Sequence, residues 1–415
     1  MEKNVGVYIH IPFCSGKCAY CDFYSIVGKD KLMSEYHSAV LQHIKEYSPQ
    51  LDGYLIDTVY FGGGTPSHFG ATRLISIFNA LKKYGNVLVD AEVTAEVNPE
   101  SVTKEELVRL RRAGFNRLSI GVQSANDTML KNLERRHSFA DAENAVSSAR
   151  AAGFQNISID LIYGLPSQTK DDWADTLNRA LAMKPDHVSC YGLKIEEGTP
   201  LYIFRDSPFV PDEDVQADMY MYAVETLSRF GLRQYEISNF ARRGYESRHN
   251  LKYWLGDEYL GLGPSAHSYL GGVRFSHIED VEKYTDSIFS GRSVIDQYED
   301  ISDFERAGEY LMLRLRTIYG ISESEYKSIF RCGMDMVTEL LENYRERGFA
   351  YQKDGRWILT TQGFMVSNVL IGEILDAHTT QRAHIARPWQ NLEEEERDQI
   401  SFFKSRRKVQ IFNGE

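Results

Sequence analysis

The first two hundred residues alternate between short apolar runs and longer segments with amphipathic spacing. The apolar runs are rich in β-branched and aromatic residues, which is typical of buried strands. They cover residues 5–13, 57–62, 92–97, 117–123, 157–163 and 187–193. The amphipathic segments predict helices over residues 31–47, 72–83, 104–113, 140–152 and 171–183. Six strand-containing units in succession predict an α/β fold with a parallel sheet, either doubly wound or closed as a barrel.

The pattern changes after residue 200. A helix is expected over residues 213–230 and a strand around 234–240, whereas residues 247–269, rich in Gly, Tyr and His, are interpreted as a loop with little regular structure. Further helices are expected over residues 304–318, 323–330, 337–347 and 362–375, with a short strand over 355–359. Helices combined with a short β wing predict a small helical, winged-helix-like domain at the C-terminal end.

These elements divide the chain into four parts. Because 415 residues exceed what one hydrophobic core usually holds, at least two domains are expected. The predicted parts are a barrel domain over residues 1–245, a connecting segment over 246–300, a helical domain over 301–375 and an appended tail over 376–415. The tail combines acidic and basic runs and receives no functional interpretation.

The overall charge limits the choice of partners. A formal net charge of -12 argues against nucleic acid or an anionic membrane as the main partner, and the wing-bearing domain has no strong basic stripe. The charge is compatible with a small ligand in a pocket whose local charge differs from the average. No stretch approaches the ~18 apolar residues of a membrane span. Because His10 and Pro12 also interrupt the one run that resembles a secretion signal, we expect a cytoplasmic protein with reduced thiols.

Three of the five cysteines lie close together and follow the first predicted strand directly. The spacing is Cys14-x-x-x-Cys18-x-x-Cys21. Three thiolates on one short loop can ligate three irons of a cubane cluster and leave the fourth iron open to a small molecule. A zinc site would need a fourth ligand, for which only His10 or His37 could be recruited. The spacing therefore favours an iron–sulfur cluster. Cys190, in the sixth strand, and Cys332 are interpreted as thiols without a special role.

Polar residues and glycines mark the carboxyl ends of the following strands. Gly62, Gly63 and Gly64 end the second strand, where absent side chains let the backbone approach a ligand. They are not a phosphate-binding P-loop, because no Gly-Lys-Ser/Thr follows. Glu96, Gln123 and Asp160 end the third, fourth and fifth strands. Since these ends meet on the site-bearing face of a barrel, the three side chains are expected to lie in one ligand site.

Taken together, these motifs resemble the radical SAM superfamily, whose hallmark is CxxxCxxC after the first strand of a partial barrel. Within it, the chain is similar to the group around oxygen-independent coproporphyrinogen III oxidase, and most similar to the HemW-type heme chaperones. The matching stretches are YIHIPFC at 8–14, GGGTPS at 62–67, EVNP at 96–99, SIGVQ at 119–123, DLIYGLP at 160–166 and HNLKYW at 249–254.

The resemblance implies a partial (β/α)6 barrel with a [4Fe–4S] cluster on Cys14, Cys18 and Cys21. It also implies S-adenosylmethionine (SAM) at the open iron. The residues that fall where this group contacts SAM are Tyr8, Tyr20, Gly63, Gly64, Thr65, Glu96, Gln123, Arg135 and Asp160. Glu134 replaces the usual glycine beside Arg135, so Arg136 is a neighbouring alternative.

Two function classes remain in competition. A radical SAM enzyme would act on a tetrapyrrole, as oxygen-independent coproporphyrinogen III oxidase does, whereas a chaperone would bind heme and pass it to an acceptor protein. Phe23 stands where the oxidases have a fourth cysteine, and only seven residues precede Tyr8, where the oxidases have an extended cover. We therefore favour the chaperone and leave enzymatic activity open. An electron donor such as a flavodoxin or ferredoxin and an acceptor, including a membrane-associated one, are the other expected partners.

The predicted heme site is the hexapeptide at 249–254, placed on a loop between the barrel and the small domain. His249 is the candidate axial ligand, with Tyr253 and Trp254 as walls and Lys252 or Arg248 for a propionate. His267 is a competing ligand. The plainer interpretation is that His249 hydrogen-bonds within a folded loop and that the aromatic residues only pack.

Overall fold

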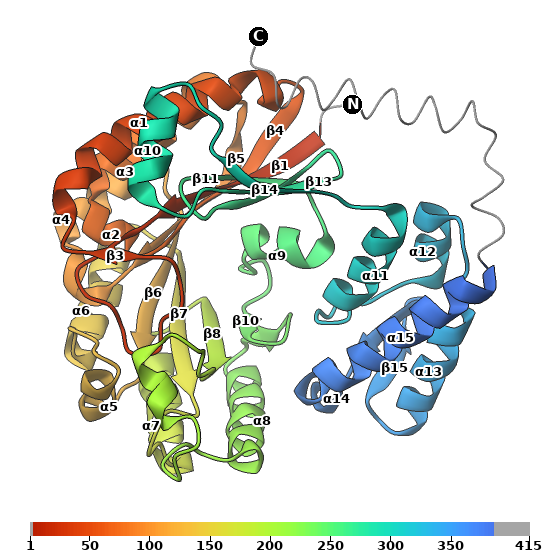
Figure 1. The fold of residues 1–415 in the computed structure, drawn as a ribbon. Coiled ribbons are helices and arrows are strands. Elements are labelled where there is room, and N and C mark those ends of the chain that lie inside the picture. The colour runs from red at the N-terminus through yellow and green to blue at the C-terminus, as the bar shows by residue number, and fades with distance from the viewer. Residues whose placement is uncertain (1–2, 386–415) are drawn as a thin grey trace, which may run out of the picture.

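Residues 3–385 are described by the computed structural model, and one twelve-stranded sheet dominates them (Figure 1). Six neighbouring strands of this sheet are parallel and form the barrel wall. They are β1 (Lys3–Ile11), β4 (Tyr54–Gly63), β5 (Val87–Val97), β6 (Arg117–Gln123), β7 (Asn156–Tyr163) and β8 (His187–Gly192). The predicted α/β partial barrel is thereby confirmed.

Helices connect these strands and cover the outer face of the sheet (Figure 1). They are α1 (Met33–Tyr47), α3 (Ala71–Tyr84), α4 (Lys104–Ala113), α6 (Phe139–Ala151) and α7 (Lys170–Ala182). Thr103, Ser138 and Thr169 begin α4, α6 and α7 with capping boxes, which satisfy otherwise unpaired backbone N–H groups. Short helices α2 (Pro66–Phe69) and α5 (Asp127–Asn132) lie in the loops at the carboxyl ends of β4 and β6.

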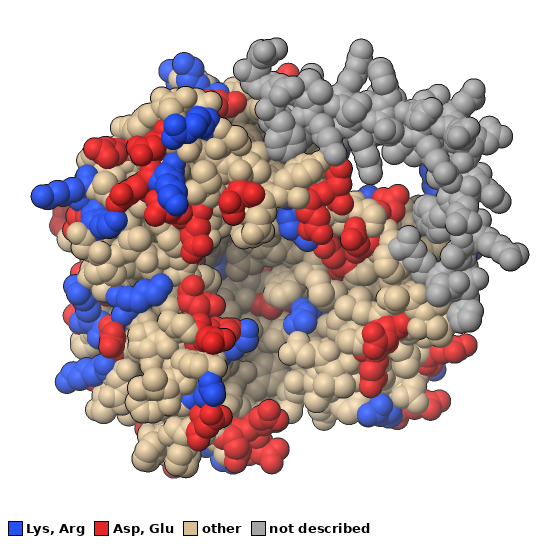
Figure 2. All heavy atoms as spheres, viewed as in Figure 1, with Lys and Arg blue, Asp and Glu red and all other residues tan. Residues whose placement is uncertain are grey.

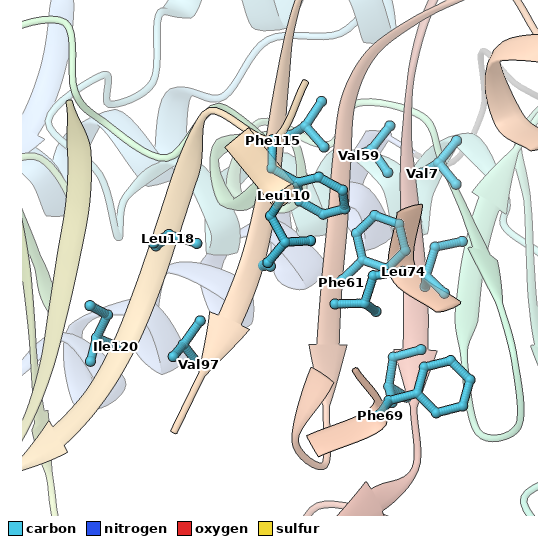
Figure 3. Packing of buried hydrophobic residues seen from close by; sticks show 14 of the residues in the cluster. Val7, Val59, Phe61, Phe69, Leu74, Val97, Leu110, Phe115, Leu118 and Ile120 are labelled. Carbon is cyan, nitrogen blue, oxygen red and sulfur yellow. The ribbon is translucent and has the colours of Figure 1, made fainter. Parts of the chain in front are cut away.

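The barrel core lies between the sheet and these helices. Alternate residues of the strands, such as Val59 and Phe61 on β4, are buried against helix residues such as Leu74 and Leu110 (Figure 3). Because one face of each parallel strand packs against helices, the other face is left to line the barrel interior. Cys190 on β8 is 1% exposed and belongs to this core, as predicted.

The sheet continues beyond the barrel on both edges. On one side β11 (Tyr259–Leu262) pairs in parallel with β1, and three antiparallel strands follow it. These are β12 (His267–Leu270), β13 (Val273–His277) and β14 (Ile295–Asp300), with α10 (Val281–Phe289) between the last two. On the other side, after α8 (Glu213–Arg229), the predicted strand around 234–240 is divided into β9 (Arg233–Gln234) and β10 (Asn239–Ala241).

The prediction that residues 247–269 form an irregular loop is wrong. The segment contains helix α9 (Arg248–Leu255), β11 and the start of β12. Ser247 caps α9 through its side chain, which accepts from the N–H of Asn250, and Gly256 ends the helix in the left-handed conformation. The hexapeptide at 249–254 is therefore helical.

The C-terminal unit is helical with a β hairpin, which confirms the predicted small winged-helix-like domain. Its elements are α11 (Asp303–Arg314), α12 (Glu323–Phe330), α13 (Asp335–Glu346), β15 (Ala350–Lys353), β16 (Arg356–Leu359), α14 (Thr361–Met365) and α15 (Ser367–Ile385). A second hydrophobic core, which includes Leu311, Tyr326, Leu341 and Trp357, holds them together. Helix α15 continues past the predicted end at residue 375, and the rest of the predicted tail lies outside the described residues. Within residues 3–385, no helix combines the length and apolar character needed to cross a membrane.

Buried polar groups attach α9 to the barrel strands. The Glu92 carboxylate on β5 accepts hydrogen bonds from the N–H groups of Arg248, at 3.1 Å, and His249, at 3.0 Å. Lys252 forms an ion pair with Asp57 on β4 at 2.9 Å, with side chains only 6% and 11% exposed. These contacts place an eight-residue helix across the strands, although a helix of this length is not stable by itself.

Replacing Lys252 by Met is expected to lower the free energy of unfolding by about 3–5 kcal/mol, because Asp57 would remain buried without a counter-charge. The matched control is Lys170→Met, whose ion pair with Asp218 is 60% and 62% exposed. That control should lose much less stability, because solvent screens an exposed ion pair. Urea denaturation followed by circular dichroism measures both. Equal stability of the two variants would contradict the structural role of the buried pair.

Candidate functional site

A cavity of about 490 Å³ opens at the carboxyl ends of the barrel strands. Figure 2 shows the molecule hollowed between the barrel and the part of the chain that carries α9. The cavity is lined by the cysteine loop, by the glycine segment after β4 and by side chains from β5 to β8. The carboxyl ends of parallel strands are where barrel proteins carry their sites.

All three cysteines of the motif line this cavity. Cys14 ends the short strand β2 (Phe13–Cys14), which pairs with β3 (Ile26–Val27), while Cys18 and Cys21 follow on the loop between these strands. The Thr65 hydroxyl donates to Cys14 Sγ at 3.4 Å, and Arg135 Nη1 donates to Cys18 Sγ at 3.6 Å. Burial raises the pKa of the Cys14 and Cys21 thiols in the absence of a ligand.

The arrangement of the three thiols bears on the kind of metal site. Among residues 3–385, no three histidine, cysteine or acidic side chains are gathered closely enough to hold one metal ion. A cubane cluster makes a different demand, because each thiolate ligates a different iron. The half-buried, hydrogen-bonded thiols at the cavity wall therefore fit the cluster that the spacing predicted better than a single zinc ion.

Gly63, the last residue of β4, and Gly64 lie close against the backbone that carries the cysteine loop. A Cβ on Gly64 would lie 2.9 Å from the carbonyl oxygens of Ile11 and Phe13 and 3.0 Å from Cys14 Sγ. Gly63 has φ +111°, and a Cβ there would lie 2.6 Å from the His10 ring. Backbone at this distance requires glycine, and it leaves the Gly63–Thr65 segment exposed to the cavity.

The predicted polar residues converge on the same cavity. Glu96 accepts from the Tyr60 hydroxyl at 2.9 Å and from the N–H of Gly63 at 3.2 Å, and burial raises its pKa to about 7. Asp160 accepts from the hydroxyls of Ser119 and Ser189, while burial raises its pKa. Tyr20, Thr65, Gln123 and Arg135 line the cavity beside them.

Arg135 is the better placed of the two neighbouring arginines. Its Nη2 donates to Asn98 Oδ1 and to the carbonyl of Gly121, both at 2.8 Å, and the side chain lines the cavity. Arg136 instead lies against Gly16, where a Cβ would meet its Nε at 3.0 Å, and is not part of the lining. The geometry therefore favours Arg135.

Two predicted ligand contacts do not line the cavity. The Tyr8 hydroxyl is hydrogen-bonded to His10 Nδ1 at 3.0 Å. The Tyr8 ring stacks on Tyr60 and His249 and is not part of the cavity lining. His249 is 1% exposed, with Nδ1 bonded to Thr58 Oγ1 and Nε2 bonded to the Tyr253 hydroxyl, both at 2.8 Å. Burial lowers its pKa to about 3. As an axial heme ligand, His249 would have to give up one of these bonds, so the geometry does not support that prediction.

The other predicted heme contacts are divided between different surroundings. Lys252 is occupied by Asp57, and Arg248 donates to the carbonyl of Asp90 at 2.9 Å, so neither predicted propionate partner is well placed. Tyr253 and Trp254 do line a cleft, but it is separate from the barrel cavity. The competing ligand, His267 on β12, lines neither of these two spaces.

Several residues of the cavity were missed by sequence reasoning. Tyr60, Arg117, Ser119, Ser189 and Asn250 all line it. Arg117 and Ser119 stand at alternate positions from the predicted Gln123, and Ser189 pairs with Asp160 across β7 and β8. Because side chains of a strand alternate between faces, counting back by two from each predicted strand end would have found them. Asn250 belongs to the HNLKYW stretch, but its place in the cavity was not predicted, since α9 was taken for a loop.

Comparisons with known proteins find similar sequences and a similar structure. A model of the radical SAM superfamily matches residues 8–180. Heme chaperone HemW of Bacillus subtilis is 32% identical over 89% of this chain and 98% of its own length. Heme chaperone HemW of Mycobacterium tuberculosis is 33% identical over 89% of this chain and 94% of its own length. Coproporphyrinogen III oxidase (HemN) of Escherichia coli has a similar structure, with a TM-score of 0.79, 23% identity and coverage of 91% and 90% of the two chains.

Proposed function

The chain belongs to the HemW family of the radical SAM superfamily, and on this basis we propose that it is a heme chaperone that binds heme and transfers it to an acceptor protein. The observation that carries the proposal is a cavity lined by the three cysteines and by most of the predicted SAM contacts, in a chain that matches relatives named heme chaperones along nearly their whole length. The oxidase is similar in fold, and this likeness by itself assigns no activity.

The cavity residues fit a [4Fe–4S] cluster and SAM. Cys14, Cys18 and Cys21 would each ligate one iron, while Thr65 and Arg135 already donate hydrogen bonds to two of these sulfurs. The exposed backbone of Gly63 and Gly64 and the Glu96 carboxylate suit the amino and carboxylate groups of SAM at the remaining iron. When bound, these two groups supply one-electron chemistry that no side chain provides.

The contrast with an oxidase rests on the mouth of the cavity. Phe23 occupies the position of the fourth cysteine in the oxidase group and is 66% exposed, although it lines the cavity. A phenyl ring at this place offers no thiol, unlike the cysteine of the oxidase group. This favours a carrier over controlled radical chemistry on a porphyrinogen.

Anaerobic reconstitution is expected to give about four irons per chain, with a brown chromophore. Cys18→Ala should lose the cluster, since one of three protein ligands is removed. Cys332→Ala is the control, because this thiol lies in the C-terminal unit, and should keep the iron content of the original protein. Iron analysis and the visible spectrum measure both. A full cluster in Cys18→Ala would refute the assignment.

The affinity for SAM is expected to rise as pH increases through about 7, because Glu96, whose pKa burial raises to about 7, must ionise to attract a cation. Asp160 opposes this ionisation and Arg117 favours it. Equilibrium binding between about pH 6 and 7.5 should show this slope in the reconstituted protein and in the surface control Glu105→Gln. Glu96→Gln should bind more weakly and without the slope. The same slope in Glu96→Gln would exclude this carboxyl as its origin.

The chaperone itself is tested by heme titration and transfer. The reconstituted protein should bind about one heme per chain, seen by its Soret band, and release it to apomyoglobin as the probe acceptor. With coproporphyrinogen III, SAM and a reductant, it should form no protoporphyrinogen. Turnover of coproporphyrinogen, or absence of heme binding, would instead support the enzyme alternative.

A further inference from the structure

A second cleft, separate from the barrel cavity, brings three arginines together with aromatic side chains. It lies between the hexapeptide helix, strands β11 to β13 and helices α11 and α12, and has a volume of about 290 Å³. Its lining includes Trp254, Tyr259, Ile329 and Phe330. Tyr253 packs edge-to-face on Tyr259 with ring centroids 4.6 Å apart, so these two rings hold each other in place.

The cleft gathers three arginines in a chain that carries a net charge of -12. Its lining contains Arg274, Arg306 and Arg314 together with Asp257 and Glu309. A guanidinium group presents a fork of N–H donors that matches a carboxylate, so three of them in one cleft can bind an anionic ligand.

Each arginine is fixed by a partner yet keeps further donors. Arg274 Nη2 donates to Glu309 at 2.7 Å, Arg306 Nη1 to Asp303 at 3.0 Å, and Arg314 Nη1 approaches Glu325 at 3.3 Å. A guanidinium has five N–H donors, so these contacts leave capacity for a ligand carboxylate. Arg314 Nε is buried and has no hydrogen-bond partner among the described residues, which is costly unless a ligand or water satisfies it.

We propose that this cleft is the cargo site, in which the flat tetrapyrrole lies against Trp254 and helix α12 and its propionates are bound by Arg274, Arg306 and Arg314. The inference rests on the proposed function and replaces the predicted propionate partners Arg248 and Lys252. Aromatic and arginine side chains that line one cleft match a molecule that is apolar over most of its surface and carries two carboxylates.

The test compares ferric heme with its dimethyl ester, which keeps the ring and iron but removes both negative charges. The reconstituted full-length protein should bind the diester at least about tenfold more weakly than heme, because the charge-assisted hydrogen bonds are lost. Difference spectra at the Soret band measure both affinities, with both ligands added from the same organic solvent. This comparison needs no variant and is independent of folding effects.

Two variants then test whether the cleft arginines bind the propionates. Arg274→Gln and Arg314→Gln should each weaken heme binding about tenfold and change diester binding by less than about twofold. A structural role alone would weaken both ligands equally. The matched control is Arg229→Gln, an exposed arginine on α8 paired with Glu225, which should leave both affinities unchanged.

The opposing outcomes are distinct. Equal affinity for heme and diester, or unchanged discrimination in both cleft variants, would overturn the site while leaving the chaperone in place. Loss of heme binding in His378→Ala, with normal binding in the arginine variants, would also overturn it and move the cargo to the apolar cavity between α11, α12 and α15. Absence of heme binding by the original protein would remove the proposed function together with the site.

Discussion

Three polar side chains of the barrel strands, Asp57, Thr58 and Glu92, are buried and find partners on helix α9. A buried carboxylate without a counter-charge or hydrogen bonds costs several kcal/mol, so the barrel and this helix form as one structure. Lys252 pairs with Asp57, the His249 ring is hydrogen-bonded to Thr58, and two N–H groups of the first turn donate to Glu92. The position of α9 is therefore fixed by the electrostatics of the barrel strands, although its eight residues have little helical stability of their own.

Helix α9 contributes residues to both spaces. Asn250 lines the barrel cavity, whereas Tyr253 and Trp254 line the cleft. His249 is bonded to Tyr253 and stacks on Tyr60, whose hydroxyl donates to Glu96. Direct contacts therefore join the lining of the cleft to the lining of the cavity. The hexapeptide at 249–254 is better understood as a helix shared by the two spaces than as a loop that offers a histidine to iron.

The parts of the fold and site that follow local rules could be predicted from sequence. The six barrel strands are recognisable as apolar runs. The three cysteines, Glu96, Gln123 and Asp160 line one cavity, with Glu96 and Gln123 at or next to the ends of their strands and Asp160 within β7. Helix α9 could not be found in this way, because its stability comes from Glu92 and Asp57, more than 150 residues earlier. The same limit applies to the direction in which side chains point. The sequence places Tyr8 and His249 near the site, but it does not show that neither side chain lines the cavity.

The charge of the chain illustrates why composition constrains partners less than local structure does. The net charge of -12 disfavours an anionic partner only if acidic residues are spread evenly. Here the fold gathers Arg274 from β13 with Arg306 and Arg314 from α11, while their partners Glu309 and Glu325 lie beside them and hold the guanidinium groups in place. The acidic residues thereby serve to orient the arginines. Because charges in a partly buried cleft are screened less than charges in bulk solvent, a dianionic ligand placed there interacts mainly with these ordered side chains and less with the average charge of the protein.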